Sequence, residues 1–383
     1  MKRRVKSTGT IPSNFFKPYV RETKRYMEDE IQKYGPKILN MVWQSEDFIR
    51  LMGNENPYGP SPKVIDALKK AAKRISKYPS PTYADLVEKL AEYASVKPEN
   101  ILLGAGSLEI MDAVFRAFLN PGDNVILSAP TYKPYILRIK VCGGKLKLIP
   151  MKKNENGFSR DIEKMLEAID SKTKAVVFMN PNNPTGIPLT REELEKVLDK
   201  PILIVIDEAY YEFCGKTFVP LIEENENIIV IRTLSKAFAM AGLRIGYTIA
   251  DQNLVDYISR VQLPFRVTEL TMHAAIAALN DMEYAKETIR KILDERERLF
   301  NEISKMEGLK PYPSAANFIL VKVTHEKYSA EKLSSLLLGK RIIVRGFTGA
   351  PGLEDGGYIR ISVGTREQND KLISALKSIL GGD

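Results

Sequence analysis

Short apolar runs alternate along the chain with segments whose apolar residues recur every three or four positions. Continuous apolar runs bounded by turn residues are typical of buried strands, and the three-to-four period is typical of covering helices. Helical spacing separates several of the runs, as in "LEIMDAVFRAFL" and "TREELEKVLDK". The pattern therefore predicts an α/β core over roughly residues 60 to 260, with a mostly parallel sheet between helices. The predicted strands are "NILLGAGS", "DNVILSAP", "TKAVVFMN", "PILIVIDEAY" and "NIIVIRTLSK".

A second pattern begins near residue 268, where one long helical segment leads out of this core. The segments "NFILVKV", "RIIVRG" and "YIRISVG" then read as strands, with helices at "SAEKLSSLLLG" and "REQNDKLISALKSIL". This arrangement predicts a small α+β domain with an antiparallel sheet. We therefore expect an N-terminal arm with one helical piece over 1–52, a large domain over 53–265, and a connecting helix with the small domain over 266–383.

Composition narrows the classes of function. The longest apolar runs in the 383 residues are far shorter than the roughly 20 residues of a membrane span, and no signal core follows the basic start. We expect a cytoplasmic protein without a membrane partner. The two cysteines match no metal spacing, and only two histidines are present, so the sequence predicts no metal site and disfavours a Ser-His-Asp triad. Lysine, tyrosine, arginine and carboxylates remain as the candidates for chemistry.

The net charge of +9 raises the question of nucleic-acid binding. Lysines are scattered along amphipathic segments such as 63–77, which is typical of solvated helix faces. The sequence contains no zinc-finger spacing and no pattern of basic and aromatic residues that indicates an RNA-binding domain. We therefore expect no nucleic-acid partner.

Two glycine- or asparagine-rich turns follow predicted strands, where an open parallel sheet binds its ligands. In "GAGS" at 104–107, backbone amides and the Ser107 hydroxyl are suited to a phosphate at a helix N-terminus, and a tight turn without ligand is the alternative. Glu109 stands where a dinucleotide fingerprint has its third small residue, which disfavours NAD. "NPNNPTG" at 180–186 is either a plain loop or a rigid set of amides that fixes a polar ligand atom.

Two charged residues also follow apolar strands. Asp207 comes after four apolar residues and requires a cation or hydrogen bonds, so a structural salt bridge is the alternative to a functional role. Lys236 lies among apolar residues, with Arg244 eight positions later. A lysine in an apolar pocket loses its proton more readily, which suits Schiff-base chemistry.

Together these turns resemble the fold-type I aminotransferases, which depend on pyridoxal 5'-phosphate (PLP), and among them the histidinol-phosphate aminotransferases. The resemblance spans most of the chain, because its motifs occur in the family's order. It implies a PLP-dependent transferase fold in which a mostly parallel seven-stranded sheet lies between helices beside a small α+β domain. It also implies a homodimer with shared active sites and ping-pong kinetics. The motifs are "NENPYGPSP", "KYPSP", "NPNNPTG", "DEAYYEF", "TLSKAFAMAGLRIGY" and "ANFILV".

The resemblance assigns a role to individual residues. Lys236 is implied as the Schiff-base lysine that carries the proton at Cα, and Asp207 as the partner of the protonated pyridine nitrogen. Tyr210, with Tyr211 as its competitor, is implied to bond the ring's phenolic oxygen together with Asn183. The remaining cofactor contacts are implied for Ala105, Gly106, Ser107, Ser235 and Arg244 at the phosphate, for Tyr132 stacked on the ring, and for Tyr78 reaching the cofactor of the neighbouring subunit. The substrate contacts are implied for Arg360 at the carboxylate, for Arg345 at a distal phosphate, and for Asn56.

Two features depart from the family pattern. The arm before residue 50 is longer than expected, and Arg266 and Thr268 stand where relatives often have asparagines. We expect an aminotransferase that moves an amino group from histidinol phosphate to a 2-oxo acid such as 2-oxoglutarate. The alternatives are an aromatic or broad-range aminotransferase, and a PLP decarboxylase of the threonine-phosphate type. A transcription regulator with an aminotransferase-like domain is disfavoured, because the residues ahead of the core carry no helix-turn-helix pattern.

Overall fold

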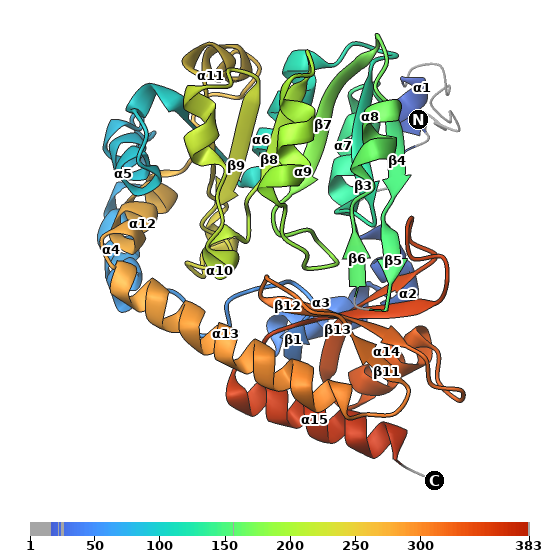
Figure 1. Ribbon diagram of the computed structural model, residues 1–383. Coiled ribbons are helices and arrows are strands. Elements are labelled where there is room, and N and C mark those ends of the chain that lie inside the picture. Colours follow the sequence, from blue (N-terminus) through green and yellow to red (C-terminus); the bar gives the residue numbers. More distant parts are fainter. Residues whose placement is uncertain (1–16, 22, 24–26, 156, 382–383) are drawn as a thin grey trace, which may run out of the picture.

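The computed structural model describes residues 17–21, 23, 27–155 and 157–381. Its large domain is built on a seven-stranded sheet with the order β2-β10-β9-β8-β7-β3-β4 (Figure 1). β10 runs antiparallel to both of its neighbours, and the other pairs are parallel, so the predicted mostly parallel sheet is confirmed. The strands are β2 (Ile101–Gly104), β3 (Asn124–Ala129), β4 (Lys145–Pro150), β7 (Thr173–Met179), β8 (Leu203–Asp207), β9 (Ile228–Thr233) and β10 (Gly246–Ala250).

The apolar pattern finds all but two of these strands. β4 has the sequence "KLKLIP", in which charged and apolar residues alternate, because it lies at the sheet edge with one side toward solvent. β10 is buried along its whole length, but it begins inside the glycine-rich stretch that follows Lys236. An amphipathic edge strand and a strand adjoining a glycine-rich turn both lack the continuous apolar run on which the prediction depends.

The sheet lies between two hydrophobic cores. Ile204 and Ile206 of β8 belong to the core under α5, α8 and α9, whereas Val205 belongs to the core under α6, α7 and α11. Successive strand residues point to opposite faces, so Asp207 continues the face of Val205. The helices of this domain are α4 (Pro62–Ala71), α5 (Ala84–Ala94), α6 (Ser107–Phe118), α7 (Lys133–Val141), α8 (Ile162–Glu167), α9 (Arg191–Leu198), α10 (Tyr211–Cys214) and α11 (Gln252–Ser259). The shorter elements are η2 (Ala72–Arg74), η3 (Pro98–Asn100), η4 (Val219–Glu223), η5 (Ala241–Leu243) and the hairpin of β5 (Lys152–Asn154) and β6 (Gly157–Ser159).

The small domain contains a five-stranded sheet with the order β1-β13-β14-β12-β11. Its C-terminal strands pair antiparallel, as predicted, but β1 of the arm joins the edge in parallel to β13. The sheet is therefore mixed, and the arm completes it. The elements are β1 (Ile49–Leu51), β11 (Leu309–Pro311), β12 (Phe318–Val323), β13 (Ile342–Thr348), β14 (Gly357–Ser362), α14 (Ala330–Gly339) and α15 (Arg366–Leu380).

The prediction of one helical piece in the arm is wrong. The described part of the arm forms α1 (Pro18–Arg21), α2 (Glu28–Tyr34) and α3 (Pro36–Gln44) before β1. Tyr34, Leu39 and Val42 pack with Met52 and Ile343 in a cluster on the small domain, while α1 contacts α7 of the large domain. These helices are short and bury few apolar residues each, so their period in the sequence is weak.

The predicted connecting helix is two helices, α12 (Glu269–Leu279) and α13 (Met282–Ser304). The break lies at Asp281, whose backbone leaves the helical region at φ −131° and ψ 49°. Its carboxylate accepts hydrogen bonds from the Ser61 hydroxyl and, at 2.7 Å, from the Lys63 ammonium group at the start of α4. This contact with the large domain explains an interruption that the apolar period does not reveal.

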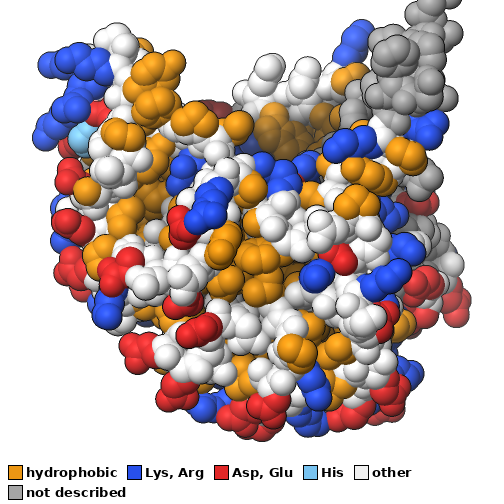
Figure 2. Space-filling view, turned by 90° about the horizontal axis from the view of Figure 1, so that it is seen from above, with side chains coloured by type: hydrophobic (Ala, Val, Ile, Leu, Met, Phe, Trp, Pro, Cys, Tyr) orange, Lys and Arg blue, Asp and Glu red, His pale blue; other side chains and the backbone are white. Residues whose placement is uncertain are grey.

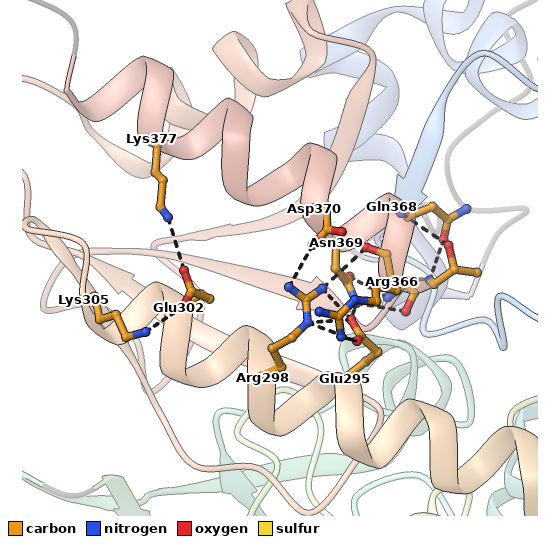
Figure 3. Close-up of polar contacts among 11 residues, drawn as sticks. Glu295, Arg298, Glu302, Lys305, Arg366, Gln368, Asn369, Asp370 and Lys377 are labelled. Atoms are coloured by element: carbon orange, nitrogen blue, oxygen red, sulfur yellow. Dashed lines mark hydrogen bonds and ion pairs between the residues drawn. The ribbon is translucent and has the colours of Figure 1, made fainter.

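Polar contacts join α13 to α15 (Figure 3). The carboxylate of Glu295 pairs with Arg298 at 2.7 Å and with Arg366 at 3.3 Å, and it accepts a hydrogen bond from Asn369 at 3.0 Å. Two turns further on, Glu302 contacts Lys377 of α15. These contacts fix the last helix of the small domain against the helix that leads from the large domain.

Acidic and basic side chains are interspersed over the face in Figure 2, and a hollow at its upper edge holds hydrophobic and basic side chains. Lys63, Lys69 and Lys70 of α4 are exposed, in agreement with the solvated helix face predicted for segment 63–77. Within the described residues, no helix combines the length and the apolar character needed to cross a membrane.

Candidate active site

The predicted site residues gather at one edge of the large sheet. The turns after β2, β7, β8 and β9 all lie at the carboxyl ends of strands that run in the same direction. This edge faces the small domain across the connection formed by residues 52–56 (Figure 1). The sheet therefore collects, in space, turns that are far apart in the sequence.

Lys236 lies in the turn after β9, beside the buried side chains of Leu234 and Ala237. Its side-chain nitrogen donates a hydrogen bond to the Gly53 carbonyl oxygen at 2.9 Å. Burial, together with the positive charge of Arg360, lowers the pKa of this amine to about 8. The environment thus raises the neutral, nucleophilic fraction of this amine above that of an exposed lysine.

Asp207 ends β8 and is only 5% exposed. One carboxylate oxygen accepts a hydrogen bond from the Tyr135 hydroxyl of α7, and the other accepts one from the Ala209 amide at 3.0 Å. Burial raises the pKa of this carboxyl group to about 6, and the adjacent charge of Glu208 also raises it. Both of these donors are neutral, so the carboxylate suits a ligand that brings a positive charge, such as a protonated pyridine ring.

The structural salt bridge that was the alternative for Asp207 is made instead by the next residue. Glu208 is fully buried and pairs with Arg232 at 3.0 Å. The guanidinium group of Arg232 also lies over the Tyr211 ring, 3.8 Å from its centroid. Tyr211 thus serves this internal pair, and Tyr210 is the tyrosine of "DEAYYEF" that contacts the predicted site residues.

Tyr210 joins a chain of hydrogen bonds that crosses between the domains. Its hydroxyl accepts from the side-chain amides of Asn54 at 2.9 Å and Asn183 at 3.3 Å. The Asn183 oxygen in turn accepts from Arg360 at 2.6 Å, and Arg360 also donates to the Met52 carbonyl at 2.5 Å. Arg360 comes from β14, so this chain ties the small domain to the sheet edge.

Gly106 and Arg244 meet at the start of α6. A side-chain carbon placed on Gly106, whose φ is +89°, would lie 2.3 Å from an Arg244 guanidinium nitrogen, so only glycine allows this approach. Ser107 is the first residue of α6, and the Ser235 hydroxyl is buried and accepts from Thr233 at 2.8 Å. A guanidinium group beside a helix N-terminus is a suitable place for a phosphate group.

Ala105 and Tyr132 flank this arrangement. The Ala105 amide donates to the Glu109 carboxylate at 3.2 Å, so within the chain this donor already has an acceptor. The Tyr132 ring lies edge-on against the ring of Tyr135, with 5.3 Å between centroids. Tyr132 is therefore adjacent to the tyrosine that holds Asp207.

Tyr78 and Asn56 are placed differently. Tyr78 is 80% exposed, lies outside this group of residues, and stacks on the Phe265 ring at 4.5 Å. Asn56 is buried, and its amide nitrogen donates to the Ala237 carbonyl at 2.9 Å and to Thr288 at 3.3 Å. One of these hydrogen bonds supports the turn beside Lys236 and the other reaches α13, and Asn54 is the asparagine that reaches Tyr210.

Arg345 and Arg360 are direct partners in the pairing of β13 with β14. Opposed residues of an antiparallel pair point to the same face, so these two arginines share one face of the small sheet. Arg345 lies beside a cavity of about 900 Å³ between the arm, α7, α14 and β13. Its guanidinium group pairs with Glu30 of α2 at 2.5 Å.

The two residues that stand where relatives often have asparagines have structural roles. Arg266 donates to the Leu103 carbonyl of β2 at 2.7 Å, and Thr268 caps α12 by accepting from the Thr271 amide at 3.1 Å. Neither contact involves the hydrogen-bonded group around Tyr210. Sequence reasoning missed Tyr135 and Asn54. Tyr135 lies one helical turn after Tyr132, but nothing in the sequence links it to Asp207.

The comparisons with known proteins agree with this geometry. The model of the family described as aminotransferase class I and II matches residues 46–376. The chain is 36% identical to the histidinol-phosphate aminotransferase of Methanocaldococcus jannaschii, with 95% of each chain covered. It is 40% identical to that of Thermoanaerobacter pseudethanolicus, covering 86% of this chain and 93% of the relative.

A solved structure is also similar to this chain. The histidinol-phosphate aminotransferase from Sinorhizobium meliloti, in complex with pyridoxal-5'-phosphate, aligns with a TM-score of 0.83 at 29% identity. The alignment covers 96% of this chain and 97% of that one. The sheet-edge arrangement of Lys236, Asp207 and Gly106 fits the amine, pyridine and phosphate contacts that the cofactor requires. The chain therefore belongs to the aminotransferase class I and II family, as the sequence motifs predicted, and is a PLP-dependent enzyme.

Proposed function

We propose that the protein transfers the amino group of histidinol phosphate to a 2-oxo acid such as 2-oxoglutarate, in two half-reactions. The observation that carries this proposal is the strand register, which places Arg345 and Arg360 opposite each other on one face of the small sheet. Two guanidinium groups suit a pair of substrates that present a distal phosphate in one half-reaction and carboxylates in the other. The names of the relatives at 36% and 40% identity support the same donor.

Bound PLP supplies an electron sink for the substrate's Cα. The chain's own residues then divide the remaining work. The Lys236 amine, whose pKa is lowered to about 8, would take the proton from Cα and deliver it to the cofactor's C4' in the first half-reaction, and would move it in the opposite direction in the second. Asp207 holds a positive charge on the ring nitrogen, and Tyr210, oriented by Asn54 and Asn183, donates to the ring oxygen.

The remaining residues bind the cofactor and the substrate. Arg244, Ser235 and the start of α6 at Gly106 and Ser107 hold the cofactor phosphate, and Tyr132 covers the ring. Arg360 receives the substrate carboxylate, for which its guanidinium group is already fixed by Asn183 and the Met52 carbonyl. Preorganised donors of this kind bind a carboxylate without further ordering cost.

A homodimer with shared sites is part of this proposal. Tyr78 stacks on Phe265 at the surface, and the large apolar side chains of Ile75, Tyr78 and Leu263 are 67%, 80% and 73% exposed. Exposed apolar side chains concentrated in two short segments are typical of a protein interface. This arrangement supports contact with a second copy, in which Tyr78 reaches the neighbouring cofactor phosphate. A cytoplasmic location remains a prediction from composition.

The test is a panel of amino donors with 2-oxoglutarate and the PLP-loaded enzyme. Histidinol phosphate, phenylalanine, tyrosine and aspartate are compared by kcat/KM, and threonine phosphate is assayed for carbon dioxide release. We expect the highest kcat/KM for histidinol phosphate. A preference for phenylalanine or tyrosine would move the assignment to an aromatic aminotransferase, and carbon dioxide release would move it to a decarboxylase.

A further inference from the structure

The arm places a carboxylate on the arginine that we assign to the donor's distal phosphate. Glu30 of α2 pairs with Arg345 of β13 at 2.5 Å, and the two side chains are only 12% and 15% exposed. The other terminal nitrogen of Arg345 contacts the Met27 sulfur at 3.4 Å. The guanidinium group is therefore engaged by residues at the beginning of α2.

Glu30 occupies a fixed position, because its helix is anchored. Tyr34, at the end of α2, packs with Leu39 and Val42 of α3 against Met52 and Ile343 of the small domain. Ile343 lies two residues before Arg345 on the same strand. The arm and the arginine thus belong to one packed unit, and the ion pair differs from a mobile contact between exposed side chains.

Apart from Glu30, the cavity beside Arg345 is rich in positive charge. Lys33 of α2, Lys133 and Lys140 of α7, and Lys332 of α14 line it together with the arginine. Glu331 is the other carboxylate among its described lining residues. A cavity with this charge attracts anions, and Glu30 places a negative charge on its arginine.

We propose that Glu30 is a specificity-determining residue, whose carboxylate must be displaced from Arg345 before the distal anion of a substrate binds there. This inference rests on the proposed function, in which that anion is a phosphate. Two anions side by side on one guanidinium group repel each other, so the substrate anion and Glu30 compete. A donor without a distal anion leaves the pair intact, and the arginine is then never buried without a partner.

Competition makes a clear prediction for the binding of inorganic phosphate to the PLP-loaded enzyme, measured by calorimetry. Loading the enzyme keeps the cradle at Gly106 filled by the cofactor. Glu30→Gln should tighten phosphate binding about threefold or more, because the strongest exposed ion pairs correspond to roughly three- to fivefold and this pair is less exposed. The same change in an Arg345→Ala background should have no effect, because the contested cation is absent.

Glu331→Gln is the matched control, because it removes the same charge from the same cavity without touching Arg345. It should change phosphate binding much less than Glu30→Gln does. Equal effects of the two variants would mean that Glu30 acts only through the overall electrostatic potential of the cavity, and this result would overturn the proposal. Unchanged or weaker phosphate binding by Glu30→Gln would also overturn it, since Glu30 would then be neutral or would orient Arg345 for the anion.

Kinetics give a second readout. Glu30→Gln should lower KM for histidinol phosphate and leave KM for phenylalanine unchanged, and equal changes for both donors would contradict the proposal. If the unmodified enzyme did not use histidinol phosphate, the proposed function would fail. The phosphate titration would still decide the role of Glu30, so the two failures are distinguishable.

Discussion

Two ionisable side chains at the sheet edge have pKa values shifted toward neutrality, for the same reason. Burial disfavours the charged form of each, so the pKa of Lys236 falls to about 8 and that of Asp207 rises to about 6. Both shifts cost stability in the protein without cofactor, because each group would ionise more easily in the unfolded chain. Residues held in an unfavourable state by the fold are typical of a functional site.

Replacing Asp207 with asparagine should separate stability from activity. The folded pKa lies above the unfolded value of 3.8, so the carboxyl group destabilises the fold increasingly as pH rises from about 4 to 6, and fully at pH 7. Asp207→Asn should therefore stabilise the cofactor-free protein at pH 7 by up to roughly 3 kcal/mol, judged from that shift, and lose most transaminase activity.

Thermal unfolding at pH 4 and pH 7 checks this expectation, because the stabilisation should be small at pH 4, where the carboxyl group is protonated. Tyr135 donates to either side chain, so that hydrogen bond does not by itself distinguish the variants. A loss of stability at pH 7 together with wild-type turnover would make Asp207 a structural residue.

The lysine should control uptake of the cofactor. Only the neutral amine attacks an aldehyde, and half of the Lys236 side chains are neutral near a pH of about 8. The rate at which cofactor-free protein develops the visible absorbance of bound PLP should therefore rise with pH to a midpoint near 8. Lys236→Ala should develop no such band and should lose nearly all turnover. A band that persisted in this variant would show that another lysine holds the cofactor.

At the scale of the elements, the site depends on which helix lies behind which strand end. Asp207 shares the face of Val205, and that face is covered by α7, so Tyr135 reaches the carboxylate. Continuous apolar runs predict the buried strands well, and the turns after them contain Lys236 and Gly106, so the sequence identifies the strand ends. Tyr135 and Asn54 are not predictable in this way, because their roles depend on contacts between elements that are distant in the sequence.

Tyr135→Phe should move the acid limb of the pH dependence of PLP binding by the cofactor-free protein. The variant removes a hydrogen bond that favours the ionised form of Asp207, so the pKa of that carboxyl group should rise further. A hydrogen bond to a charged group is worth about 1.5–3 kcal/mol, which corresponds to an upward shift of the acid limb by roughly one to two pH units.

Tyr93→Phe is the control for this variant. Its hydroxyl also donates to a buried carboxylate, Glu212 at 3.4 Å, but it packs against the core on the other face of the sheet. The control should lower thermal stability without moving the acid limb. An unchanged acid limb in Tyr135→Phe would mean that Tyr135 only packs.

At the scale of the whole molecule, the arm shows where sequence patterns stop being informative. Its helices α2 and α3 pack against the small domain. There Glu30 pairs with Arg345, and Tyr34 packs in one cluster with Ile343. The long helical pattern after residue 268 is interrupted for a similar reason, since Asp281 bonds Ser61 and Lys63 of the large domain. Contacts between different parts of the molecule leave no periodic pattern in the sequence. The fold class was therefore predictable, but these contacts were not.

The shared-site homodimer predicts complementation between two inactive variants. Tyr78→Ala lacks the residue proposed to act across the interface, and Lys236→Ala lacks the amine. Mixed dimers should contain one site with both residues and recover up to about half of the activity per mixed dimer, provided that Tyr78 acts in the partner. Sedimentation equilibrium establishes that dimers form. Mixed dimers without recovered activity would show that Tyr78 does not serve the neighbouring site.

The most direct test of the central claim is the kinetic effect of Arg345→Ala on two donors. A phosphate contact to arginine is worth about 1.5–3 kcal/mol, so KM for histidinol phosphate should rise by roughly tenfold or more. Phenylalanine has no distal phosphate and should be affected much less, because Arg360 still receives its carboxylate. Equal losses for both donors, or no activity of the unmodified enzyme on histidinol phosphate, would contradict the account.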